Sequence, residues 1–149
     1  MNQTEAVFLQ DVFVQIDLAV VERVIALQGF QAPAIPHAPY NRHEREIRII
    51  LRHLGEMTVP ARLTHVHRLV VEAIQDQHDY FSDWHAARER KTPFQPGLTY
   101  PAVERSSQKL RAVYEELKRL YPRENKQNTQ SFYDYPCALD FVCSERRWK

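Results

Sequence analysis

The sequence predicts an all-α fold, a bundle of four main helices with a C-terminal segment packed on its side. Apolar residues recur at helical spacing in four stretches of the chain before residue 122. Loops that contain proline separate some of these stretches, and no strand–turn–strand pattern occurs in the first 120 residues. Because each amphipathic helix must bury its apolar stripe, a bundle is the most economical arrangement of four such helices.

The first predicted helix, residues 4–28, carries apolar stripes on two opposite sides. A surface helix needs one stripe, so this helix must be covered twice, either wholly by its own bundle or by the bundle and a partner. The stripe that we expect in the core comprises Leu9, Val12, Phe13, Ile16, Ala19, Val20, Val24 and Leu27. The stripe that we expect at an interface comprises Val7, Val14, Leu18, Val21 and Ile25.

Glycine and asparagine residues mark the predicted ends of the first two helices. Gly29 and Gly55 each follow the last periodic residue and suit the left-handed position after a helix. Two capping-box-like pairs indicate helix starts, Asn2 with Glu5 and Asn41 with Glu44.

The remaining helices follow from the same periodicity. After an extended connection at 30–40, helices are expected at about 42–54, 60–88 and 100–121, with a second proline-bearing loop at 89–99. We expect residues 1–122 to form the bundle, and 123–149 to be a linker and a docking segment of the same domain. The segment that docks is predicted at 132–143. Its Cys137 and Cys143 are expected to be reduced thiols, although a small-loop disulfide is the alternative.

Composition and charge exclude several classes of protein. The chain has 149 residues, with 20 basic and 19 acidic side chains and a net charge of +1, which makes nucleic acid an unlikely partner. No apolar run reaches the roughly 20 residues of a membrane span, so we expect no membrane partner. The first residues lack the features of a secretory signal, and the expected location is the cytoplasm.

Charged residues are segregated between the second and third predicted helices. Two interpretations stay open: two solvated faces that pair at their border, or a bipolar surface that steers a charged partner. The basic ridge comprises Arg42, Arg45, Arg48 and Arg52, and the acidic ridge comprises Glu72, Asp76, Asp79 and Asp83.

The seven histidines do not predict a metal site or a cofactor. On the third helix His67 and His78 are eleven residues apart, about 16 Å along a helix axis, too far for one ion to bridge. We also expect no pairing of histidine with carboxylate at i,i+3 or i,i+4, the spacing that builds metal sites in bundles. A metal site would need ligands from other helices, such as His43 or His53 with Glu72 or Asp76. We interpret His67, His78 and His85 as residues at the edge of the core.

Arginine and histidine recur at one spacing that suggests an alternative function. Arg48 with His53, and Arg62 with His67, both read R-x4-H. This spacing resembles the R-x4-6-H motif of HEPN-type ribonucleases, which are small all-helical proteins. The resemblance implies metal-independent RNA cleavage at a dimer interface, with arginine holding a phosphate and histidine helping to activate the ribose 2′-hydroxyl.

The function that the sequence favours is binding without catalysis. No nucleophile, phosphate-loop or metalloprotease motif occurs in the chain. We therefore expect a small soluble interaction or regulatory protein, such as an inhibitor, adaptor or immunity-type binder, with a protein partner and a homodimer through residues 4–28. Aromatic residues near the loops and the tail offer a second surface or pin these segments to the bundle: Phe94, Tyr100, Phe132, Tyr133, Tyr135, Phe141 and Trp148.

Overall fold

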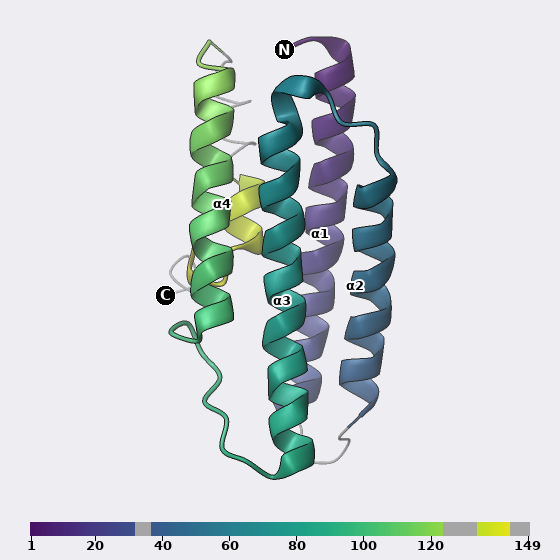
Figure 1. Ribbon diagram of the computed structural model, residues 1–149, viewed down its shortest axis with the longest axis vertical. Helices are drawn as coiled ribbons and strands as arrows, with labels where there is room; N and C mark the ends of the chain where they lie inside the picture. The colour runs from purple at the N-terminus through teal and green to yellow at the C-terminus, as the bar shows by residue number, and fades with distance from the viewer. Residues whose placement is uncertain (32–36, 124–133, 144–149) are drawn as a thin grey trace.

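The protein is an up-down bundle of four helices that run antiparallel to their neighbours in sequence (Figure 1). The computed structural model describes residues 1–31, 37–123 and 134–143. No strand occurs in these ranges, and the predicted all-α bundle is confirmed. The helices are α1 (Gln3–Gln31), α2 (Ala38–Glu56), the short 3-10 helix η1 (Ala61–Leu63), α3 (Thr64–Arg90) and α4 (Pro101–Leu120).

The start of α1 agrees with the sequence analysis, whereas the two helix ends predicted at glycines do not. The first capping-box-like pair is confirmed, because the Glu5 backbone N–H donates to Asn2 Oδ1 and the Asn2 side-chain amide donates to Glu5 Oε1, both at 2.8 Å. Gly29 and Gly55 were predicted to end their helices, which is wrong, since α1 and α2 continue past them. A Cβ atom at Gly29 would lie 2.6 Å from the Pro39 ring, so this glycine allows a close approach between two helices.

The predicted start of the second helix is also wrong. α2 begins at Ala38, with Pro39 in its first turn, and Asn41 lies inside the helix. Proline suits a first turn, because its missing N–H would have no helical partner there and its φ angle is already helical. The third helix begins with η1 and becomes α-helical only at Thr64, not at 60.

The core divides into two clusters along the bundle. The larger is mainly aliphatic and joins α1, α2, α3, α4 and residues of the C-terminal segment. The smaller is mainly aromatic and lies toward the end where α1 and α3 finish, with Phe30, Tyr80, Phe81 and Trp84 buried in it. Val24 was expected in the core, which is wrong: its side chain is 46% exposed, because it lies at the edge of the buried stripe, where no described residue covers it.

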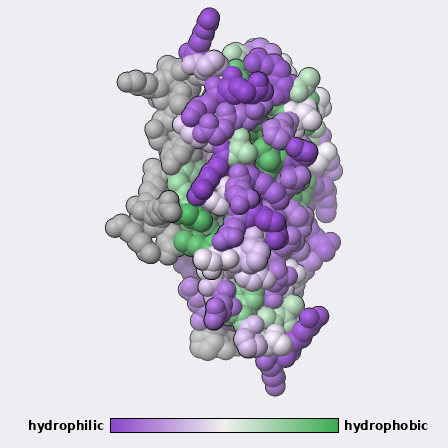
Figure 2. All heavy atoms as spheres, turned by 60° about the vertical axis from the view of Figure 1, so that its left-hand side comes forward, coloured by the Kyte–Doolittle hydropathy of each residue, from purple (hydrophilic) through white to green (hydrophobic). Residues whose placement is uncertain are grey.

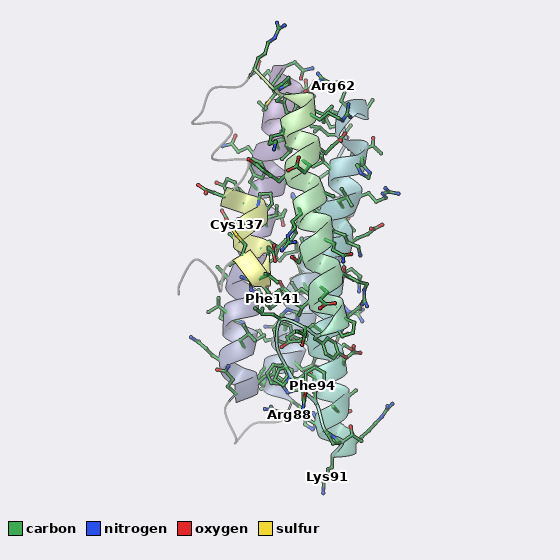
Figure 3. All side chains as sticks on the ribbon, turned by 90° about the vertical axis from the view of Figure 1, so that its left-hand side faces the viewer. Arg62, Arg88, Lys91, Phe94, Cys137 and Phe141 are labelled. Carbon is green, nitrogen blue, oxygen red and sulfur yellow. A yellow bond between two sulfur atoms is a disulfide. The ribbon has the colours of Figure 1, made fainter. Side chains whose placement is uncertain are left out.

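The C-terminal segment, residues 134–143, lies between α1 and α4 (Figure 3). Its Leu139 is buried in the larger cluster. The prediction of reduced thiols is wrong, because Cys137 and Cys143 form a disulfide, with their Cα atoms 5.5 Å apart. The helix breaks at Asp140, whose Oδ1 accepts the Val142 amide at 2.9 Å, and this turn brings the two cysteines together.

Candidate functional site

The outer face of α1 is apolar and exposed. No residue in the described parts of the chain buries it, and the exposed fractions of its large side chains range from 46% to 60%. Ile25, which was predicted to belong to the interface stripe, is half-buried at the border. The outer α1 face comprises Val7, Val14, Leu18, Val21 and Val24.

The spacing of this face is that of a helix that pairs with another helix. Positions 7, 11, 14, 18, 21 and 25 alternate in steps of four and three, which is the 3.5-residue repeat of a coiled-coil stripe. All but one of these positions are apolar, and the exception is Asp11. The Asp11 carboxylate lies 3.0 Å from His53 Nε2 of α2, so the one charged position has a partner within the chain.

An open hollow continues the outer α1 face at its N-terminal end. Its volume is about 500 Å³, and it lies between the start of α1 and the connection from α2 to η1. Val7 and Asp11 belong both to this hollow and to the 3.5-residue repeat, so the apolar face and the hollow form one continuous surface. The lining residues are Gln3, Thr4, Val7, Phe8, Asp11, Met57 and Thr58.

The inner face of α1 carries buried charges instead. Arg23 is 5% exposed and donates to the carbonyls of Leu139 and Ala138, the second at 2.9 Å. Its guanidinium also lies 4.3 Å from the centre of the Phe141 ring. Burial lowers the pKa of Arg23 to about 10, while the charge of Asp140 acts in the opposite direction. Arg23 therefore attaches the C-terminal segment to α1.

The acidic ridge is partly buried, which corrects the sequence analysis. Asp76 is 5% exposed, because Lys109 and Arg105 of α4 reach it at 2.7 and 3.4 Å. The acidic side of α3 thus packs on α4, and its main partner is not the arginine ridge of α2. All four ridge arginines are exposed, and three of them pair with acidic residues on α1 and α2: Arg42 with Glu22, Arg45 with Glu46 and Arg48 with Glu44. The face around α4 is largely hydrophilic (Figure 2).

The two R-x4-H pairs are engaged in other contacts. Arg48 bonds to Glu44 at 2.7 Å, whereas His53 turns to α1. Arg62 donates to the Leu120 carbonyl at 3.1 Å, and His67 Nε2 lies 2.8 Å from the Leu54 carbonyl. Among the described residues no hydrogen bond joins the two members of either pair. The ribonuclease alternative stays an untested prediction that no contact described here favours.

A buried polar cluster crosses the interior between α1, α2 and α3. Gln77 donates to the Ala19 carbonyl at 3.0 Å and lies 3.1 Å from His43 Nε2. Within the described residues, His43 Nδ1, Gln77 Oε1 and both ring nitrogens of His78 have no hydrogen-bond partner. Burial, and then the neighbouring His78, lower the pKa of His43 to about 3, so its imidazole is neutral at pH 7.

The sequence analysis missed a group of residues that could hold a metal ion. His37, His85 and Glu89 bring two imidazoles and a carboxylate within reach of one point. The expectation that no histidine pairs with a carboxylate at i,i+3 or i,i+4 is wrong, because His85 and Glu89 have the i,i+4 spacing of one helical turn. His37 comes from the start of α2, and no local pattern places it there.

The aromatic residues of the loops and the tail mostly fasten those segments to the bundle. Phe94, Tyr100 and Phe141 pack against the aromatic cluster. Tyr135 stacks on Phe13 of α1 with ring centres 4.3 Å apart. Three others that the sequence analysis singled out lie outside the described residues: Phe132, Tyr133 and Trp148.

Comparison with known proteins gives no relative for this arrangement. No family model, curated protein or solved structure matches the chain. In the described ranges, no helix has both the length and the apolar character needed to cross a bilayer. The proposals below therefore depend on the geometry of the chain alone.

Proposed function

We propose that the protein acts by binding, without catalysis, and that the outer α1 face pairs with the same face of a second copy. The observation that supports this is the set of five large apolar side chains exposed along one side of α1. Removing such side chains from water stabilises an association by about 25 cal/mol per Å² of apolar area. A continuous apolar patch on an otherwise polar surface is typical of a protein-interaction site.

The 3.5-residue repeat favours a helix as the partner of this face. α1 has 29 residues and is about 43 Å long, which is enough for three heptads of side-by-side packing. A second α1 offers the same repeat, and a twofold arrangement would use one patch on both copies. Asp11 is already paired with His53, so pairing of the outer α1 faces leaves no charge of the repeat without a partner.

The test is the mass of the protein in solution, measured by light scattering after size exclusion across a dilution series. We expect a dimer that dissociates only at low concentration. A monomer at every concentration would contradict the proposal. The outer α1 face would then no longer support a role as a regulator, inhibitor, adaptor or immunity-type binder.

The cytoplasmic location expected from the sequence stays a prediction, and the disulfide makes it testable. Structural disulfides persist in oxidising compartments and are rare in the cytosol. Thiol labelling of protein taken directly from the cells that make it would distinguish the cytoplasm from an oxidising compartment. Free Cys137 and Cys143 support the cytoplasm, whereas a complete Cys137–Cys143 bond supports an oxidising compartment.

A further inference from the structure

Three side chains converge at the end of the bundle where α2 begins and α3 finishes, one from the residue before α2 and two from α3. His37 Nδ1 lies 3.0 Å from His85 Nε2. The Oε1 atom of Glu89 lies 3.6 Å from the first of these nitrogens and 3.8 Å from the second. The same three atoms therefore form a small, nearly equilateral triangle.

Hydrogen bonding accounts for only one side of this triangle. The 3.0 Å side fits a bond from one imidazole N–H to the other ring nitrogen. The two distances to the Glu89 carboxylate exceed the range of about 2.7–3.2 Å that hydrogen bonds prefer. Glu89 thus faces both rings at close range without a hydrogen bond to either.

A metal ion accounts for all three sides. In a triangle with these sides, the point equidistant from the three atoms lies about 2 Å from each, which is the length of zinc–nitrogen and zinc–oxygen bonds. We propose that His37, His85 and Glu89 bind a divalent transition-metal ion, with Zn²⁺ as the ion that their two imidazoles and one carboxylate suit best.

The surroundings hold the ligands in place and leave one side open. Tyr40 stacks flat on the His85 ring, with ring centres 4.1 Å apart and planes 10° apart, which fixes the orientation of that ring. The side chain of His85 is 12% exposed, whereas those of His37 and Glu89 are 57% and 53% exposed. Three protein ligands at such a surface leave the fourth position of a tetrahedral ion for water.

Binding would also join the start of α2 to the end of α3, whereas the chain connects the end of α2 to the start of α3 through η1. His37 stands directly before α2, and the other two ligands lie in the last turns of α3. An ion held between them stabilises the folded state, because an unfolded chain does not bring the three ligands together. The site shares no residue with the outer α1 face, so it is independent of the proposed dimer.

The experiment is a calorimetric titration of the full chain with Zn²⁺ alone, combined with thermal unfolding with and without the ion. We expect one Zn²⁺ per chain and a higher Tm in its presence. His37→Gln and Glu89→Gln change exposed side chains, and each should weaken binding by a factor of ten or more. Co²⁺ in place of Zn²⁺ should give the visible absorption of a tetrahedral site in the parent only.

The matched control is His53→Gln. His53 is an exposed histidine of α2 that also faces a carboxylate, Asp11, but the described residues offer it no third ligand. The His53→Gln variant should bind Zn²⁺ as tightly as the parent does. Three results would overturn the proposal: no uptake by the parent at about 100 µM Zn²⁺, unchanged binding by both ligand variants, or an equal loss in His53→Gln. Circular dichroism of each variant confirms that it is folded.

Discussion

α1 and α4 are both outer helices of the bundle, and they differ in what they bury and what they expose. α4 buries aliphatic residues such as Val103, Leu110 and Leu117, and its exposed positions are polar or charged apart from Pro101 at its start. α1 buries Glu5, Glu22 and Arg23 and exposes five large apolar side chains. The bundle accounts for every residue of α4, whereas the outer face of α1 requires something beyond the described residues to cover it.

The largest expected effect is the loss of stability when a charge is placed on the inner face of α1. Ile16 is fully buried, so Ile16→Asp places an unpaired carboxylate in the core and should cost more than about 3 kcal/mol of stability. Urea unfolding followed by circular dichroism measures it. A variant with the stability of the parent would show that Ile16 is not in the core.

The next largest effect comes from removing the buried cation of α1, Arg23. Arg23→Met leaves the carbonyls of Leu139 and Ala138 without their donor, and we expect a loss of about 2–3 kcal/mol together with release of the C-terminal segment. Limited proteolysis of residues 134–143 and urea unfolding measure the two effects. Arg23→Lys serves as the control, because it keeps the charge but loses the two-pronged donor, and should lie between parent and Arg23→Met.

The third effect distinguishes the outer face of α1 from that of α4. Leu18→Asp and Gln108→Asp each add one negative charge at an exposed position, on α1 and α4 respectively. Both variants should fold, but only Leu18→Asp should dissociate the dimer, by a factor of about 100 in Kd, because it puts a charge in an apolar contact. Light scattering across a dilution series measures it. Unfolding of Leu18→Asp would instead mean that α1 is wholly internal.

The fourth effect is a response to acid of the buried histidine between α2 and α3, His43. The pKa of His43 is about 3 in the folded protein and about 6.5 in an unfolded chain. Below pH 6.5 the unfolded state binds a proton that the folded state does not, so stability falls toward pH 3 by up to about 1.4 kcal/mol per pH unit. His43→Gln lacks this contribution, and its urea midpoint should depend less on pH. Equal slopes for parent and variant would contradict the neutral imidazole.

The smallest expected effect is a change in the affinity of the proposed dimer. Partial burial raises the pKa of Asp17, an exposed residue of α1 next to Leu18. Pairing of the outer faces would remove more water from this carboxylate, so Asp17→Asn should tighten the dimer a few-fold. Dilution experiments on the parent and the variant measure it. Weaker association of Asp17→Asn would show that the carboxylate has a favourable partner across the interface.

Much of the fold could be predicted because helical periodicity is a local property. The spacing of apolar residues identified four helices, and on α1 it separated the buried Ile16 from the exposed Leu18. Periodicity gave the wrong expectation where the residues packed around a side chain decide whether that side chain is buried. Val24 lies within the apolar pattern yet no described residue covers it, and Asp76 has the pattern of a surface residue yet is covered by two cations of α4.

The candidate sites depended still more on contacts between distant residues. The pair His85–Glu89 is visible in the sequence as a single helical turn, but its third member, His37, becomes a neighbour only when α2 packs against α3. The disulfide depends on a break at Asp140 inside a short helical segment, and residue spacing alone does not reveal that break.

The contact between Arg23 and Leu139 has a consequence for the order in which the chain is made. The two residues are 116 positions apart, so the ribosome completes α1 long before it adds the carbonyls that receive the guanidinium. Synthesis proceeds at about 5–20 residues per second, so several seconds separate the synthesis of Arg23 from that of Ala138 and Leu139. A nascent chain that stops short of these two residues would lack their bonds to Arg23, so α1 reaches its native packing only after Leu139 has been made.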